Sequence, residues 1–155
     1  MNGNPKIIET LNALLAGELT AINQYIVHSE MSSNWGYEKL HKADEKRAID
    51  EMQHAEKLIT RILFLEGIPV VSHLKKISIG SDIAAQHKND MNSEIDTIAM
   101  YNNGIMLSVE VGDSGTRELL ESILKDEEVH LDWLEAQISQ ISQMGIQNYL
   151  ADQLG

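Results

Sequence analysis

Four glutamates and two histidines form the most specific chemical pattern in the sequence. Glu-x-x-His motifs stand at Glu51–His54 and Glu127–His130, and two further glutamates, Glu18 and Glu94, interrupt apolar stripes with helical spacing. Residues three apart lie on one face of a helix, so each motif can direct a carboxylate and an imidazole at the same ion. The two motifs are 76 positions apart, as are the two lone glutamates. The pattern predicts a centre for two metal ions.

The same offset relates other parts of the chain, which indicates an internal repeat. Pairs that it aligns are Tyr25 with Tyr101, Asp50 with Asp126, Ile22 with Ile98, Leu58 with Leu134 and Ile62 with Ile138. One helical hairpin is therefore used twice, and the molecule is expected to have approximate two-fold symmetry. Two similar metal positions would then lie side by side at its centre, as in helix bundles that combine two glutamates with two Glu-x-x-His motifs.

A third Glu-x-x-His, formed by Glu38 and His41, does not follow the repeat. The offset places Ser114 opposite Glu38, and no lone carboxylate accompanies this pair. We expect Glu38 and His41 to lie on a solvated helix face.

The six residues offer hard oxygen donors and borderline nitrogen donors, which suit iron or manganese and tolerate zinc. The charges of four carboxylates balance those of two divalent cations. Bound metal would therefore offset the free-energy cost of burying the carboxylates. The alternative is four buried carboxylates paired with Lys or Arg, but apart from Arg47 these stripes carry almost no basic residue. The expected roles are bridging for Glu51 and Glu127, and terminal for Glu18 with His54 and for Glu94 with His130.

Composition limits the possible functions. The 155 residues fit a single domain (1–155), and the formal charge of −12 argues against nucleic-acid binding. There is no cysteine, so thiolate metal sites and disulfides are excluded. No apolar run approaches the length of a membrane span, and Met1–Lys6 does not resemble a signal peptide. A cytoplasmic protein is expected.

Apolar periodicity predicts an all-α fold. Asn4, with Pro5 in the first turn, is expected to cap the first helix, and Ser81 or Asp82 the third. Gly67 and Pro69 should end the second helix, and residues 68–80 have no helical period, so they form a crossover as long as the bundle. The expected helices are 5–34, 38–66, 82–111, 114–144 and, at the C-terminus, 146–154.

Other polar and aromatic residues carry weaker signals. Tyr25 and Tyr101 lie two turns after the lone glutamates; packing is the expected role, with hydrogen bonding to a ligand or oxidation near the site as alternatives. The remaining histidines have no accompanying carboxylate set, and we expect surface or satisfied roles for His28, His41, His73 and His87. Trp35 and Trp133 are expected to pack.

Several segments together resemble the bacterioferritins over essentially the whole chain: 21–25 (AINQY), 49–52 (IDEM), 62–67 (ILFLEG), 126–135 (DEEVHLDWLE) and 144–150 (MGIQNYL). The resemblance implies a ferritin-like four-helix bundle that assembles into a hollow shell of 24 subunits and stores iron as a ferric mineral. It also implies a ferroxidase centre that oxidises two Fe(II) per subunit with oxygen or hydrogen peroxide, made of Glu18, Glu51, His54, Glu94, Glu127 and His130.

The resemblance further implies haem b shared between two subunits, with Met52 of each as an axial ligand and a bacterioferritin-associated ferredoxin as the electron donor for iron release. Met52 follows Glu51, so it is turned about 100° away from the core stripe. The alternative for Met52 is packing in an interface. Aromatic residues expected near the haem are replaced here by Ile26 and Glu45.

Some relatives have an inner-surface iron site that uses Asp50 and a histidine at position 46. Asp50 is therefore a further candidate ligand, but Lys46 replaces the histidine, which puts this site in doubt. Alternative functions are a non-storage di-metal oxidase or manganese catalase on the same bundle, and a haem-carrying subunit of a shell mixed with a second bacterioferritin chain. Positions matching pore-lining residues of relatives are Asn34, Glu66, Asp132 and Asn148.

Overall fold

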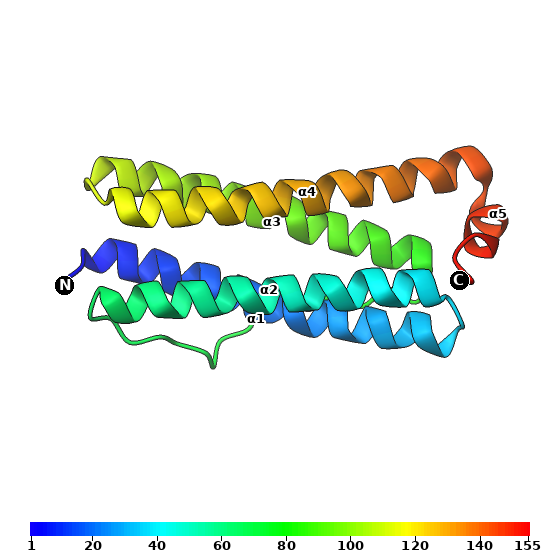
Figure 1. The fold of residues 1–155 in the computed structure, drawn as a ribbon, viewed down its shortest axis with the longest axis horizontal. Helices are drawn as coiled ribbons and strands as arrows, with labels where there is room; N and C mark the ends of the chain where they lie inside the picture. Colours follow the sequence, from blue (N-terminus) through cyan, green and yellow to red (C-terminus); the bar gives the residue numbers. More distant parts are fainter.

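A computed structural model describes residues 1–155 and contains five helices (Figure 1). The α1–α2 and α3–α4 hairpins lie side by side, and the crossover from α2 runs back along the first hairpin, so that α3 is parallel to α2. The all-α bundle expected from the sequence is confirmed. The helices are α1 (Pro5–Asn34), α2 (Glu38–Phe64), α3 (Ile83–Glu110), α4 (Ser114–Met144) and α5 (Ile146–Ala151).

Polar side chains begin the helices as expected. The Asn4 side chain accepts a hydrogen bond from the Lys6 amide at the start of α1. At α3 the cap is Asp82, whose carboxylate accepts from the Ala85 amide at 2.8 Å. Each cap satisfies a backbone N–H that has no partner within the helix.

The ends of α3 lie within one residue of the expected bounds, and two other helix ends differ by more than that. α2 ends at Phe64, and the residue in the left-handed conformation is Glu66 (φ 62°), not Gly67. Gly67 is needed for packing instead, because a Cβ there would lie 2.7 Å from Cγ2 of Ile8. The last helix stops at Ala151, three residues before the expected end.

The main core lies in the half of the bundle that holds the N-terminus. The apolar faces of all four long helices supply it, with Leu11, Leu15, Leu58, Ile62, Tyr101, Leu120 and Ile123 completely buried. A second, smaller cluster of Leu40, Ile83 and Tyr149 holds α5 against the other end. Along α2, α3 and α4 the metal-ligand candidates lie between residues of the two clusters, and on α1 Glu18 follows the buried residues of the main core. None of the helices is both long and apolar enough to span a membrane.

Polar side chains on one face of α1 fasten the crossover. Gln24 accepts from the Ser78 amide at 3.0 Å, and Nε2 of His28 accepts from the Gly80 amide at 3.1 Å. Thr20 and Asn12 accept from the Lys75 and Val70 amides in the same way. The crossover thus has fixed backbone partners over most of its length, although it contains no regular secondary structure.

Replacing Gln24 with alanine should therefore lower the free energy of unfolding by about 2–3 kcal/mol. The substitution leaves the Ser78 amide without its acceptor and removes a 2.8 Å hydrogen bond to buried Asp90. Urea unfolding measures the change. Asn23→Ala is the matched control, because the exposed Asn23 bonds only the carbonyl of Leu19 in its own helix. Equal losses in both variants would contradict the assignment of Gln24 as a crossover anchor.

Candidate metal centre

The six predicted ligands meet at the middle of the bundle. Each of the four long helices contributes: Glu18 comes from α1, Glu94 from α3, the first Glu-x-x-His from α2 and the second from α4. None of the six residues is more than 4% exposed. The inward positions follow from helical periodicity, because each glutamate replaces an apolar residue of the stripe that faces the core.

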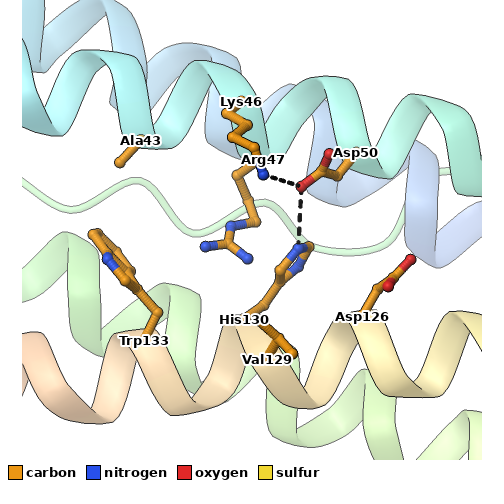
Figure 2. Close-up of a pocket in the computed structure, with 8 residues that line it drawn as sticks. All are labelled: Ala43, Lys46, Arg47, Asp50, Asp126, Val129, His130 and Trp133. Carbon is orange, nitrogen blue, oxygen red and sulfur yellow. Dashed lines mark ion pairs between the residues drawn. The ribbon is translucent and has the colours of Figure 1, made fainter.

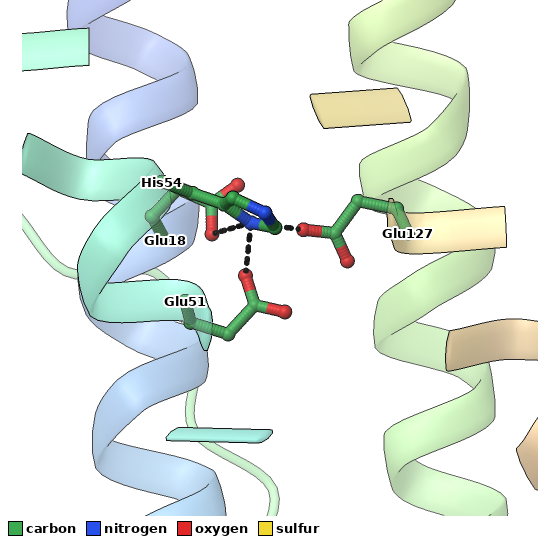
Figure 3. Close-up of side chains that lie close together, drawn as sticks. All are labelled: Glu18, Glu51, His54 and Glu127. Atoms are coloured by element: carbon green, nitrogen blue, oxygen red, sulfur yellow. Dashed lines mark hydrogen bonds and ion pairs between the residues drawn. The ribbon is translucent and has the colours of Figure 1, made fainter. Parts of the chain in front are cut away.

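The ligand atoms form two overlapping groups, each with atoms that all lie within 4.8 Å of one another. Glu51 and Glu127 belong to both groups, as a bridging role requires. Figure 3 shows the first group, in which Nδ1 of His54 faces carboxylates from three helices. The first group consists of Glu18, Glu51, His54 and Glu127, and the second of Glu51, Glu94, Glu127 and His130.

Each histidine directs one ring nitrogen at the carboxylates and the other at an aspartate. Nδ1 of His54 lies 2.9 Å from Glu127, while its Nε2 lies 2.9 Å from Asp126. Nδ1 of His130 lies 3.1 Å from Glu51, and its Nε2 lies 3.4 Å from Asp50. An aspartate on the outer nitrogen fixes the ring orientation and leaves the inner nitrogen free to bind metal.

These aspartates act between the two hairpins. Asp126 belongs to α4 and holds the histidine of α2, whereas Asp50 belongs to α2 and holds the histidine of α4. Asp50 was expected as a possible ligand, but it lies outside both groups of ligand atoms. The role of Asp126 was missed, although the 76-residue offset had already aligned it with Asp50.

The two tyrosines follow the same crossed arrangement. Tyr25 of α1 donates to Glu94 of α3 at 2.7 Å, and Tyr101 of α3 donates to Glu18 of α1 at 2.5 Å. Packing was the expected role, and both rings are indeed buried, with Tyr101 in the main core. Their hydroxyls also make hydrogen bonds to candidate ligands, which was the alternative. Burial, together with the neighbouring carboxylates, raises the pKa of both tyrosines, so each hydroxyl remains a donor.

Without metal, the charges of the centre are unbalanced. Burial raises the pKa of Glu51, and repulsion from Glu18 adds to the shift; burial and Glu127 do the same for Glu94. Burial alone would lower the pKa of His54, but hydrogen bonds to Glu127 and Glu18 raise it to about 10. Without metal, protons held by these residues therefore offset part of the negative charge that two metal ions would otherwise balance.

Several buried carboxylate oxygens in the centre have no well-aligned hydrogen-bond donor, although Nδ1 of His54 and of His130 lie 2.9 and 3.4 Å from the two oxygens of Glu127. They are one oxygen of Glu18, one of Glu94 and both of Glu127. Unpartnered buried carboxylate oxygens are rare and costly in folded proteins. Their convergence in two overlapping groups, with nitrogen donors beside them, fits a pair of cations with oxygen-rich coordination.

Met52 lies apart from the metal centre. It is 47% exposed on the outer face of the α1–α2 hairpin. Beside it is a surface groove of about 220 Å³ whose apolar lining includes Ile22, Ile26 and Ile49. The structure thus places Met52 on the surface, next to apolar residues that no other part of the chain covers.

Surface or satisfied roles were expected for the other histidines; His28 and His87 have satisfied, buried roles, and His41 departs from the solvated face expected for it. His28 is fully buried, with Nδ1 at 3.0 Å from Asp90, which lies 62 positions away on α3. His87 is also buried and contacts the hydroxyl of Tyr149 at 3.0 Å. His41 is not on a solvated face, because its Nδ1 bonds the backbone carbonyl of Ser29 at 3.0 Å.

An asparagine in place of Asp126 should weaken metal binding by about 10- to 100-fold. The amide cannot offer the His54 ring the charged acceptor that fixes its orientation, while the ligand set itself is unchanged. A Co(II) titration followed by absorption measures the affinity. Asp132→Asn, with the same charge change on the same helix but no contact with a ligand histidine, is the control. Unchanged Co(II) affinity in Asp126→Asn would contradict the role.

Comparisons with known proteins agree with this geometry. Residues 8–144 match the model of the ferritin-like domain. The chain is 42% identical to a bacterioferritin of Rhodobacter capsulatus over 96% of this chain and 92% of that protein. It is 38% identical to a bacterioferritin of Mycobacterium leprae, over 97% of this chain and 95% of that protein. The chain therefore belongs to the bacterioferritin family of ferritin-like proteins.

Proposed function

We propose that this protein stores iron and that its buried centre is a ferroxidase. Two Fe(II) ions are the substrate, and oxygen or hydrogen peroxide takes their electrons. The ferric product collects as a mineral inside a hollow shell of 24 copies in the cytoplasm. The observation that carries the proposal is the pair of ligand groups that share Glu51 and Glu127, with four carboxylates for two divalent ions. The relatives are named bacterioferritins, which supports iron storage.

The residues of the chain would contribute positioning, charge balance and exclusion of water. Glu51 and Glu127 hold the two ions close together, so that both electrons reach one oxidant molecule. Two electrons and two protons convert oxygen to hydrogen peroxide, or hydrogen peroxide to two waters. The tyrosines keep Glu18 and Glu94 oriented through their hydrogen bonds. Burial strengthens these interactions relative to water.

Anaerobic addition of Fe(II) followed by exposure to oxygen tests the function. The expected result is a rapid phase that saturates at two irons per chain, then slower growth of a ferric core in a large shell. A di-metal oxidase would give the rapid phase without a core. A manganese catalase would release oxygen from hydrogen peroxide. If the protein shows no rapid two-iron phase and forms no ferric core, the proposal is overturned.

We also propose that Met52 binds haem b where two copies of the chain meet. The apolar groove beside it could form half of a haem pocket, and a second copy would supply the other half with its own methionine. Haem bound there would carry electrons inward when iron is released, from a bacterioferritin-associated ferredoxin. Ile26 and Glu45 line the groove without aromatic contacts, so weaker binding is expected.

Reconstitution with haem should give a Soret band at one haem per two chains, and Met52→Leu should abolish it. Leucine has nearly the same volume but no thioether sulfur, so packing is preserved. Absorption spectra of both proteins measure the effect, and Met106→Leu, on an exposed part of α3, is the control. An identical spectrum for Met52→Leu would remove this residue as the ligand.

A shell mixed with a second chain is a separate alternative, and mass spectrometry of shells isolated from cells distinguishes it from a shell of one chain.

A further inference from the structure

A cavity of about 450 Å³ opens between α2 and α4, directly beside the metal centre. His130 forms part of its wall, so this cavity adjoins the second group of ligands. Two basic residues of α2 line it: Figure 2 shows Arg47 extending into the space between the helices, whereas the largely exposed Lys46 lies along α2 beside Asp50. The internal repeat does not reproduce these basic residues, because the 76-residue offset pairs them with Ser122 and Ile123. The symmetry of the bundle is broken at this point.

Arg47 has no ionic partner. The other two arginines, Arg61 and Arg117, pair with carboxylates at 2.8 and 2.7 Å. The guanidinium of Arg47 lies 5.7 Å from the ring centroid of Trp133 and makes no hydrogen bond within the chain. A half-buried guanidinium with unused donors is unusual in a protein with twice as many acidic as basic residues. Its planar set of donors matches an oxyanion.

The two carboxylates of the cavity are already engaged. Asp50 lies 3.6 Å from Nζ of Lys46 and 3.4 Å from Nε2 of His130. Asp126 lies 2.9 Å from Nε2 of His54. Their charges are thus partly compensated within the chain. Arg47 acts on the buried carboxyl of Asp44 only through space and forms no ion pair with it, so its donors stay unused.

We propose that this cavity binds inorganic phosphate through Arg47 and Lys46. The role of the bound phosphate rests on the proposed ferroxidase function. Four carboxylates neutralise two Fe(II), but two Fe(III) leave a net charge of +2 in the centre. The anion would therefore be attracted most strongly after oxidation, next to His130, where ferric iron moving toward the cavity would meet it.

Phosphate binding is tested on the metal-free shell, so the result does not depend on iron oxidation. Titration at low ionic strength, followed by Trp133 fluorescence in a Trp35→Phe background and by equilibrium dialysis, should show one saturable phosphate per chain. Arg47→Gln should weaken binding by about 10-fold or more, because it removes a charge-assisted contact. Arg47→Lys should weaken it less, since it keeps the charge but loses the forked geometry.

Lys57→Gln is the control, because it removes one exposed positive charge from the same helix outside this cavity. It should leave phosphate affinity unchanged. Binding that does not saturate, or equal binding by the parent and Arg47→Gln, would overturn the proposal. A protein that binds phosphate but fails to oxidise iron would instead overturn the ferroxidase function and leave the phosphate site intact.

Discussion

Glu51→Gln is expected to make the metal-free protein more stable and to reduce iron oxidation by at least about 100-fold. Glu51 is a member of both ligand groups, so its loss weakens both metal positions at once. Replacing an outer partner of a ligand already costs about 10- to 100-fold in affinity or activity, and removal of a shared ligand should cost at least as much.

The gain in stability has a separate cause. Burial, with repulsion from Glu18, raises the pKa of Glu51, so the ionised form is unfavourable in the folded protein. An amide of the same shape removes that repulsion and has both a donor and an acceptor to offer Nδ1 of His130, which lies 3.1 Å from Glu51. We expect the free energy of unfolding to rise by about 1–2 kcal/mol near neutral pH.

Chemical denaturation with a chelator present and initial rates of Fe(II) oxidation measure the two effects. Glu56→Gln is the control, because it removes the same charge from an exposed position on α2. Loss of stability together with loss of activity in Glu51→Gln would show a structural role for the carboxylate. That outcome would contradict the prediction that the carboxylate of Glu51 destabilises the metal-free protein.

The metal-free protein should lose stability as the pH rises from about 5 to 10. The raised pKa of His54, about 10, means that its contribution is fully present below its ordinary value of 6.5 and disappears as the pH passes through 10. Glu51 and Glu94 also have raised pKa values, so they retain protons above the pH at which the unfolded chain releases them. In this range the folded state binds more protons, and rising pH therefore favours unfolding.

The opposite behaviour is expected below this range. Interactions with Glu94, His54 and Glu51 outweigh burial and lower the pKa of Glu127. Its contribution is present above the ordinary pKa of 4.5 and is lost as the pH falls. The metal-free protein should therefore be most stable at mildly acidic pH.

Metal should reverse the alkaline loss, because ligands bind metal in their deprotonated forms and binding releases protons. Thermal unfolding at fixed protein concentration, with a chelator or with Zn(II), measures both curves. The two should diverge with increasing pH. His54→Gln should flatten the metal-free curve, whereas the exposed His73→Gln should not. Parallel curves with and without Zn(II) would contradict the linkage.

Spacing along the helices was enough to predict the bundle and the assembly of the six ligands. A glutamate within an apolar stripe must face the core, and the 76-residue repeat identified which glutamates belong together. The repeat could not reveal whether the tyrosines and aspartates contact ligands of their own hairpin or of the other one. Tyr25 and Tyr101 were read as packing residues because their partners lie on the opposite hairpin.

Contacts between distant segments account for the other differences. His28 lacked a visible partner in the sequence because Asp90 is on another helix, and the Gly80 amide that it accepts from lies in a segment without periodicity. Nothing in the sequence marks Glu66 as a left-handed residue, because the adjacent Gly67 is the residue type that usually adopts this conformation after a helix. There, close packing against Ile8 requires the glycine, and the turn falls one residue earlier.

Because of the crossed hydrogen bonds, the metal ligands can be oriented only after the two hairpins have come together during folding. Each hairpin carries a glutamate, a Glu-x-x-His motif, a tyrosine and an aspartate, but the tyrosine and the aspartate complete ligands of the other hairpin. A folding intermediate with both hairpins formed and undocked would contain every helix and no oriented ligand set. In a refolding experiment, the rate at which metal binding appears would therefore report the rate at which the two hairpins dock. This step would follow the formation of the helices.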